Sequence, residues 1–175
     1  MVSIRKERAA DLTSRERLLD DAFGRARWRK TSQRLRHGRA PAEGLSFVAA
    51  EGGRIIGTAR LWEVTCHAGR RALLLGPVAV AAECRNRGVG AALVRHSINA
   101  ARRRGHRAIV LIGDASYYAR FGFSSAKTLG LRMPGPFDPE RLLGLELSPG
   151  ALDGARGLLR ADGRVLEPEI AASAA

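Results

Sequence analysis

The residues between 73 and 90 combine an apolar run with a glycine-containing turn, a pattern that suits the binding of an anion. Residues 73–80 read Leu-Leu-Leu-Gly-Pro-Val-Ala-Val, which is typical of a buried strand, and Gly88 and Gly90 stand at the start of a helical pattern. Backbone N–H groups in the first turn of a helix have no partner within it, and they lie at the positive end of the helix dipole. Such a turn binds phosphate groups through its backbone. The sequence therefore predicts a diphosphate site at residues 85–90.

A Gly-Pro pair, Gly76 and Pro77, lies inside the apolar run. Proline has no N–H to donate to a neighbouring strand, so within sheets it is confined to edges and bulges. We expect a bulge that turns the end of this strand away from its parallel neighbour. That neighbour is the apolar run at residues 108–112, because the helical pattern of residues 88–104 between the two runs predicts a strand-helix-strand unit.

This region resembles the acetyl-coenzyme A site of the GNAT superfamily of N-acetyltransferases, in its bacterial branch. The family signature is Arg or Gln, two residues, Gly, one residue, and Gly or Ala. Arg85, Gly88 and Gly90 fill its three specified positions. In a second signature a tyrosine stands four residues before a Gly-Phe pair, and Tyr118 takes that place before Gly122-Phe123.

The resemblance extends over about residues 2 to 148. Near the N-terminus, Ile4-Arg5 and residues 9–12 are similar to the first strand and the start of the first helix in the family. Two other phosphate-binding motifs do not fit the glycine turn. The dinucleotide fingerprint requires a third glycine where this chain has Leu93, and the P-loop requires a Gly-Lys-Ser/Thr triplet that the chain lacks.

The resemblance implies both a fold and a reaction. The fold is α/β (α+β), with a mixed, mostly antiparallel central sheet, a splayed parallel pair of strands and flanking helices. The reaction is direct transfer of the acetyl group from acetyl-CoA to a primary amine, without a metal. Tyr118 would give a proton to the departing coenzyme A thiolate, a general-acid step typically worth about 100- to 10,000-fold in rate.

The resemblance also places the coenzyme along the chain. Its diphosphate would lie on the backbone amides of the glycine turn. Its pantetheine arm would lie beside the splayed strand like an added strand, bound by the backbone of Val78 and Val80. The expected coenzyme-binding residues are Val78, Ala79, Val80, Arg85, Asn86, Arg87, Gly88, Val89, Gly90 and Ala91.

Hydrophobic periodicity and turn residues predict the rest of the fold. We expect one GNAT domain over residues 2–148 and a C-terminal extension over residues 149–175, partly disordered, which frays from about Asp162. Asp11 is the expected N-cap of the first helix, and Asp114 that of the short helix carrying Tyr118. Further expected elements are strands at residues 2–8, 45–50, 54–64, 72–80, 129–133 and 142–147, and a basic helix at 31–36.

The chain is strongly basic, with a formal net charge of +13 in 175 residues. Basic surfaces attract nucleic acids and other anions. However, lysine is rare while arginine, alanine and glycine are common, as a GC-rich genome would produce, and no nucleic-acid-binding motif accompanies the charge. We therefore expect only weak, non-specific binding to nucleic acid. The basic cluster between Arg25 and Arg39 is either a solvated surface or a wall near the coenzyme phosphates or an acidic substrate.

We expect a cytoplasmic protein without a membrane partner. No apolar run approaches the roughly 20 residues that span a bilayer, and the N-terminus is charged without an apolar signal core. Cys66 and Cys84 are too few for a disulfide framework and are not spaced as metal ligands, so we interpret them as free thiols.

The sequence leaves the general base and the acceptor open. Glu63 and His67, near a predicted bend, are the titratable residues nearest the expected groove, and water is the third candidate for the base. Where many relatives carry Asn after the second parallel strand, this chain has Asp114. The acceptor could be a small amine, an aminoglycoside, a peptide N-terminus or a protein lysine. A homodimer remains open as well.

The alternative function is that of a catalytically silent GNAT-fold regulatory protein, which either binds acyl-CoA or associates with nucleic acid. Tyr118 and the intact glycine turn favour the enzyme. The basic cluster between Arg25 and Arg39 is the only feature that favours the alternative. The alternative stays open because fold alone does not determine function.

Overall fold

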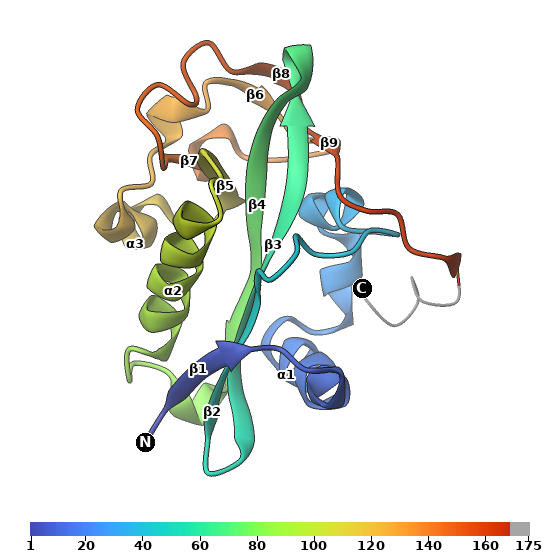
Figure 1. The fold of residues 1–175 in the computed structure, drawn as a ribbon, viewed down its shortest axis with the longest axis vertical. Helices are drawn as coiled ribbons and strands as arrows, with labels where there is room; N and C mark the ends of the chain where they lie inside the picture. Colours follow the sequence, from blue (N-terminus) through green and yellow to red (C-terminus); the bar gives the residue numbers. More distant parts are fainter. Residues whose placement is uncertain (169–175) are drawn as a thin grey trace.

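The computed structural model describes residues 1–168 and contains a seven-stranded sheet between helices (Figure 1). The strand order is β1-β2-β3-β4-β5-β7, with β9 paired to β3. Every pair in this sheet is antiparallel except β4 with β5. This confirms the mixed, mostly antiparallel sheet expected from the sequence. The strands are β1 (Ser3–Lys6), β2 (Ser46–Glu51), β3 (Arg54–Cys66), β4 (Arg70–Val80), β5 (Ala108–Ile112), β7 (Leu142–Glu146) and β9 (Arg160–Ala161).

Helices cover both faces of the sheet. The helix α1 (Leu12–Phe23) and the 3-10 turns η2 (Arg25–Arg29) and η3 (Thr31–Leu35) lie on one face, and α2 (Val89–Arg103) lies on the other (Figure 1). The short α3 (Ala115–Tyr118) follows β5. The other 3-10 turns are η1 (Ala9–Asp11), η4 (His67–Gly69), η5 (Ala82–Cys84), η6 (Ala119–Phe121), η7 (Ser125–Lys127) and η8 (Pro139–Arg141), and β6 (Gly130–Arg132) pairs with β8 (Arg156–Leu158) in a separate sheet. No described helix is both long and apolar enough to cross a bilayer.

The helix α2 follows its predicted apolar periodicity. Its predicted core positions are all buried, and Gly105 follows its end with a φ of 80°. Glycine adopts this left-handed conformation without steric cost, which ends the helix. The buried positions are Val89, Leu93, Val94, Ile98 and Ala101.

The strands β4 and β5 pair only at their start and then diverge. Their registered pairs are Leu73 with Ile109 and Leu74 with Val110. The register between β3 and β4 shifts just beyond this point. Leu75 pairs with Leu61 and Val78 pairs with Ala59, so β4 advances three residues where β3 advances two. The bulge expected at Gly76 and Pro77 is therefore confirmed. The indole N–H of Trp62 donates to the Gly76 carbonyl at 2.5 Å, which anchors the bulge to β3.

Asp11 begins α1 as expected, but its carboxylate does not cap that helix. It accepts the backbone N–H of Arg8 at 2.7 Å and two guanidinium hydrogen bonds from Arg5 at 2.6 and 2.8 Å. The hydrogen bond from Arg5 is the main reason why the pKa of Asp11 falls to about 2. The expected basic helix at residues 31–36 is instead the 3-10 turn η3, which the extended backbone of Lys30 separates from η2.

The C-terminal segment packs against the domain as far as it is described. The N–H of Ala40 donates to the Arg164 carbonyl at 2.8 Å, and the N–H of Leu166 donates to the Gly38 carbonyl at 2.9 Å. The Leu166 side chain is buried. The fraying that we expected from about Asp162 is thus not found up to residue 168, because these pairings tie the segment to the loop after η3. Residues 169–175 lie outside the described part.

Candidate active site

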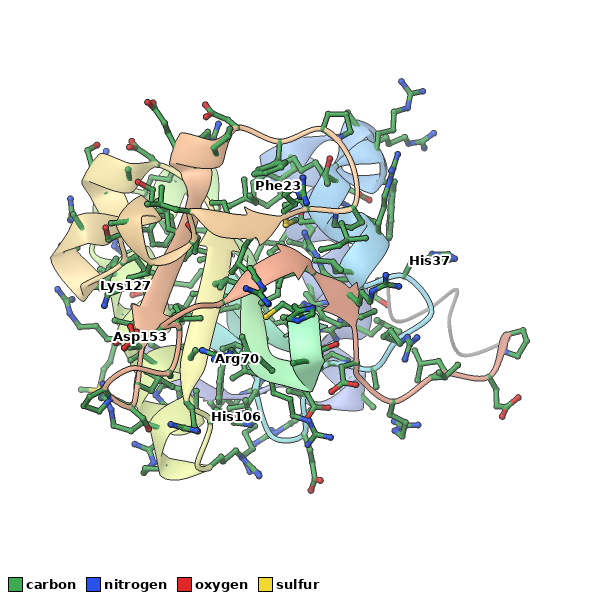
Figure 2. The ribbon with its side chains drawn as sticks, turned by 90° about the horizontal axis from the view of Figure 1, so that it is seen from above. Phe23, His37, Arg70, His106, Lys127 and Asp153 are labelled. Atoms are coloured by element: carbon green, nitrogen blue, oxygen red, sulfur yellow. The ribbon has the colours of Figure 1, made fainter. Side chains whose placement is uncertain are left out.

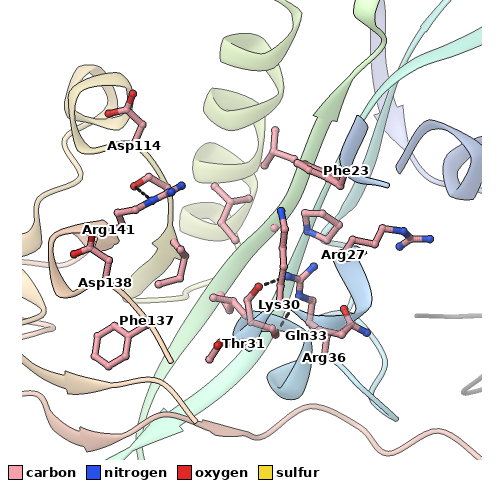
Figure 3. A pocket seen from close by; sticks show the side chains of 18 of the residues that line it. Phe23, Arg27, Lys30, Thr31, Gln33, Arg36, Asp114, Phe137, Asp138 and Arg141 are labelled. Atoms are coloured by element: carbon pink, nitrogen blue, oxygen red, sulfur yellow. Dashed lines mark hydrogen bonds between the residues drawn. The ribbon is translucent and has the colours of Figure 1, made fainter. Parts of the chain in front are cut away.

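A cavity of about 530 Å³ opens where β4 and β5 diverge. Residues 76–78 of β4, residues 112–114 and Tyr118 line it, and η2 and η3 contribute further lining residues. Its volume is typical of a pocket for a small molecule. Figure 3 shows the charged and polar side chains on the two sides of β4, with Lys30, Gln33 and Arg36 on one side and Asp114, Asp138 and Arg141 on the other.

Tyr118 lines this cavity from the end of α3. Its ring packs edge-on against Phe123, with ring centroids 5.8 Å apart, and Gly113 leaves room for it, since a Cβ there would lie 2.5 Å from the ring. Burial, followed by the proximity of Tyr117, raises the pKa of Tyr118 to about 12. The hydroxyl of Tyr118 therefore keeps its proton at neutral pH.

Tyr117 faces a different part of the molecule. A Cβ at Gly90 would lie 3.5 Å from the Tyr117 hydroxyl, which places that hydroxyl beside the first turn of α2. Arg120 stacks on the Tyr117 ring at 4.5 Å. Successive residues of a helix point about 100° apart, so only one of the two tyrosines faces the cavity.

Asp114 caps the short helix α3, as the sequence predicted. Its carboxylate accepts the backbone N–H of Ser116 at 2.9 Å and the Ser116 hydroxyl at 2.8 Å. These hydrogen bonds lower the pKa of Asp114, so the carboxylate is a weaker base than an ordinary aspartate.

The glycine turn presents unpaired backbone donors. Among residues 1–168, no partner is found for the backbone N–H groups of residues 86–91, and the first hydrogen bond of α2 runs from Ala92 to the Gly88 carbonyl at 2.9 Å. Gly88 has a φ of 78° and Asn86 a φ of 61°, so both have left-handed backbones. Six neighbouring free donors at a helix N-terminus suit a diphosphate.

Of the two arginine side chains of the turn, Arg87 is paired within the protein and Arg85 is not paired with a carboxylate among the described residues. Arg87 makes two hydrogen bonds with Glu51, at 2.7 and 3.0 Å, and a third to the Cys84 sulfur at 3.5 Å. Arg85 is exposed. Coenzyme binding through the backbone of the turn would not need the Arg87 side chain.

Glu63 and His67 do not line the cavity, contrary to our expectation. Glu63 pairs with Leu73 in the sheet, before β4 diverges from β5, and lines a second cleft of about 660 Å³ with Arg70 and His106. Figure 2 shows Arg70 and His106 well apart from Phe23, which lines the first cavity. His67 is exposed beyond the end of β3, with Nε2 3.4 Å from the Arg156 guanidinium. Both residues therefore lie near the start of β4, away from the point where β4 and β5 diverge.

Three features of the cavity were not identified from the sequence. Trp62 anchors the bulge through the Gly76 carbonyl, and Gly113 accommodates the Tyr118 ring. The third is the division of the basic cluster: Arg27 and Arg36 are buried in the cavity wall, whereas most other arginines of the cluster are exposed. A tryptophan within a predicted strand and a glycine directly after one were the available signals, but neither points to a cavity by itself.

Ion pairs of the buried Arg27 hold η2 against α1. The guanidinium of Arg27 binds the carboxylate of Glu16 at 2.5 Å and that of Asp20 at 2.9 Å. Glu16 is also bound by the fully buried Arg15, at 2.6 Å. These contacts tie the η2 part of the cavity wall to α1.

Residues 9–123 match the model of the acetyltransferase (GNAT) family. The chain belongs to this family. The match includes the glycine turn, Tyr118 and the bulged strand β4. It confirms the family resemblance derived from the signatures.

Solved GNAT structures resemble this protein along most of its length. The structure of the N-acetyltransferase YhbS from Escherichia coli, in complex with CoA, has a TM-score of 0.79 at 27% identity and covers 92% of this chain and 89% of that one. A GNAT family acetyltransferase from Brucella melitensis, in complex with acetyl-CoA, has a TM-score of 0.69 at 26% identity, over 93% of this chain and 96% of that one.

In sequence, the curated YhbS of E. coli K12, an uncharacterized N-acetyltransferase, is 32% identical over 85 residues. These residues are 49% of this GNAT chain, and the chain spans about half (51%) of the length of that curated relative.

Proposed function

We propose that this GNAT protein transfers the acetyl group of acetyl-CoA directly to a primary amine, with Tyr118 as the general acid. The observation that carries the proposal is the cavity between β4 and β5, which Tyr118 lines at one end of the divergence. The CoA and acetyl-CoA complexes of the two similar structures support the identity of the acyl donor.

Two stretches of backbone support the proposed coenzyme site. The free N–H groups of residues 86–91 suit its diphosphate, and the edge of β4 beyond Leu75 has no partner strand on the β5 side among the described residues. Val78 and Val80 lie on that edge, where their backbone groups would bind the pantetheine arm as an added strand. When bound, acetyl-CoA supplies a thioester whose carbonyl carbon accepts the amine.

The chemical step requires two proton movements in addition to the formation of a C–N bond and the breaking of the C–S bond. Tyr118 donates its hydroxyl proton to the departing sulfur. With a pKa of about 12, the tyrosinate so formed is a strong base and regains a proton from the amine nitrogen or from water. A backbone N–H of β4 near the thioester carbonyl would stabilise the negative charge that develops on its oxygen.

The experiment screens acceptor amines with the purified protein and acetyl-CoA, and the release of free coenzyme A thiol is measured. Tyr118→Phe is the matched catalytic variant, and Tyr117→Phe is its control. An amine-dependent release of thiol supports the proposal. Coenzyme binding without any amine-dependent release across small amines, aminoglycosides, peptides and protein lysines would contradict it.

The basic cluster gives little support to a nucleic-acid function. Arg27 and Arg36 are nine-tenths buried in the cavity wall, so their guanidinium groups cannot reach a duplex backbone. The arginines that remain exposed, such as Arg25 and Arg29, allow weak binding that falls with ionic strength. A tight, sequence-selective DNA complex that is lost on changing Arg25 and Arg29 to Ser would reverse this conclusion.

A further inference from the structure

Two cations in the η2–η3 wall of the cavity have no carboxylate paired with them among the described residues. Of its residues, Lys30 and Arg36 have no ion-pair partner among residues 1–168, in contrast to Arg27, which is bound by Glu16 and Asp20. Figure 3 shows Lys30 and Arg36 together on this side of β4. Two neighbouring cations without an anion are an unfavourable arrangement in a protein wall.

Arg36 is the more deeply placed of the two cations. Only 9% of it is exposed, and its guanidinium donates to the Ser32 carbonyl at 3.3 Å and to the Ser32 hydroxyl at 2.6 Å. Its burial, together with the charge of Arg27, lowers its pKa to about 10. Two neutral acceptors do not compensate a buried guanidinium, which has five N–H donors and a full charge.

Gln33 supplies an unpaired donor in the same wall. Its residue is 8% exposed, and Nε2 of its amide has no hydrogen-bond partner among the described residues. Buried amide groups are almost always paired, so a donor without a partner in a cavity wall indicates a group that a ligand supplies.

The two carboxylates of the cavity lie on its other side and are already engaged. Asp138 accepts the backbone N–H of Glu140 at 2.9 Å, as Asp114 does that of Ser116. The third cation, Arg141, lies with them and donates to the Gly113 carbonyl at 3.4 Å. Hence no carboxylate of the cavity neutralises Lys30 and Arg36.

We infer that the acceptor is a small amine that also carries an anionic group, a carboxylate or a phosphate, which binds to Lys30 and Arg36 beside Gln33. The inference rests on the proposed transfer to an amine and names the class of acceptor. An anion supplies the missing charge for the two cations and an acceptor for the free amide N–H. The cavity volume of about 530 Å³ limits the acceptor to a small molecule or the end of a chain.

The same charges help the amine to react. Partial burial, followed by the charges of Arg36 and Arg141, lowers the pKa of Lys30. An acceptor ammonium in this cavity would experience the same repulsion and lose its proton more readily, leaving the neutral, nucleophilic amine. Lys30 and Arg36 would repel a purely cationic amine, which Asp114 and Asp138 could attract only to the other side of the cavity, whereas the anionic group would hold the acceptor at Lys30 and Arg36.

The test compares acceptors that differ only in the anion. Small α-amino acids are assayed against their carboxamides, and O-phosphoethanolamine against ethanolamine, by thiol release from acetyl-CoA. We expect at least a tenfold higher kcat/KM for the anionic member of one pair, and the pair that shows it distinguishes carboxylate from phosphate. Arg36→Met should reduce that preference at least tenfold. Lys30→Met, at an exposed position, provides the same test if the buried Arg36 variant does not fold.

Arg29→Met is the matched control, because Arg29 belongs to the same basic cluster but is exposed and does not line the cavity. It should leave the preference unchanged. Equal or better turnover of the neutral members would overturn the inference while the proposed function stands.

A binding measurement keeps the two proposals separable. The melting temperature is measured with saturating CoA and either N-acetylglycine or its carboxamide, and either O-phosphoethanolamine or ethanolamine. If no amine releases thiol but an anionic probe alone raises the melting temperature, and Arg36→Met abolishes that rise, the inference stands and the proposed function fails. If no anionic probe binds or reacts better than its neutral partner, the inference is wrong.

Discussion

The proposed coenzyme site and the proposed acceptor site differ in the groups that would contact a ligand. On the side of the proposed coenzyme site, the groups are backbone amides of one continuous turn, residues 86–91, whose arginine Arg87 is turned to Glu51. On the side of the proposed acceptor site they are side chains such as Lys30, between η2 and η3, and Arg36, directly after η3. Ion pairs of Arg27 tie η2 to α1. Backbone amides can bind the coenzyme that the family has in common, and many sequences present such amides where glycines permit the conformation. Selectivity for one acceptor requires particular side chains.

Removal of the buried Arg27 and its ion pairs should have the largest effect on stability, and it should act on the η2–η3 wall of the cavity and not on the glycine turn. Arg27→Met removes the arginine that pairs with Asp20 and leaves Glu16 with only its second arginine partner, Arg15. Breaking a buried pair costs about 3–5 kcal/mol, and because the two carboxylates are partly exposed we expect about 3 kcal/mol less free energy of unfolding. Urea unfolding measures it, with the exposed Arg29→Met as a control within about 0.5 kcal/mol. A loss of stability below about 1 kcal/mol would show that the ion pairs do not hold the wall.

Obstruction of the glycine turn should come next, and on the backbone side only. In Gly90→Val, the larger side chain hinders a phosphate from approaching the amides. Hydrogen bonds to a charged group are worth about 1.5–3 kcal/mol each, so the loss of two raises the Kd for acetyl-CoA about 100-fold or more. Calorimetric titration measures this Kd.

Two variants control for side effects at the turn. Gly90→Ala should be tolerated, because its methyl group would meet Tyr117 and Val80 at 3.5 Å, an ordinary contact distance. Arg87→Ala removes only a partly exposed ion pair with Glu51, so we expect less than a threefold change in Kd. Wild-type affinity in Gly90→Val, or a large loss in Arg87→Ala, would remove the distinction between the two sides.

Tyr118 lines the cavity, and its substitution should affect turnover alone. Tyr118→Phe retains the ring and its packing but removes the proton, so kcat should fall at least about tenfold with little change in coenzyme affinity or melting temperature. Tyr117→Phe, whose hydroxyl lies beside α2, should turn over nearly as the wild type. Normal turnover of Tyr118→Phe together with impaired Tyr117→Phe would reverse the assignment. Normal turnover of both would mean that solvent protonates the thiolate.

The smallest effect concerns the pH dependence of kcat. Burial raises the pKa of Tyr118 from its ordinary value of about 10 to about 12, so the hydroxyl remains protonated at every pH well below 12. We therefore expect less than a twofold decline in kcat between pH 7.5 and pH 10, measured with a saturating acceptor. A decline with a midpoint below pH 10, absent from Tyr118→Phe, would contradict the raised pKa.

The elements that the sequence predicted well are those set by local pattern. The apolar spacing of residues 89–101 placed α2, and Gly76-Pro77 marked the bulge, because periodicity and the missing proline N–H act within a few residues. The 3-10 form of η3 and the salt-bridged role of Asp11 were missed, since each depends on neighbours outside the local sequence.

The sequence by itself determined the family and the glycine turn, and it singled out Tyr118 as the candidate acid, because the required spacings lie within short stretches of consecutive residues. Only the tertiary structure decided which charged groups share a cavity. It moved Glu63 to another cleft through strand register, and it brought Lys30, Arg36 and Tyr118 to one cavity across more than eighty residues of chain. Side-chain proximity between distant segments depends on sheet order and on the packing of η2 and η3 against α1, and no local pattern contains that information.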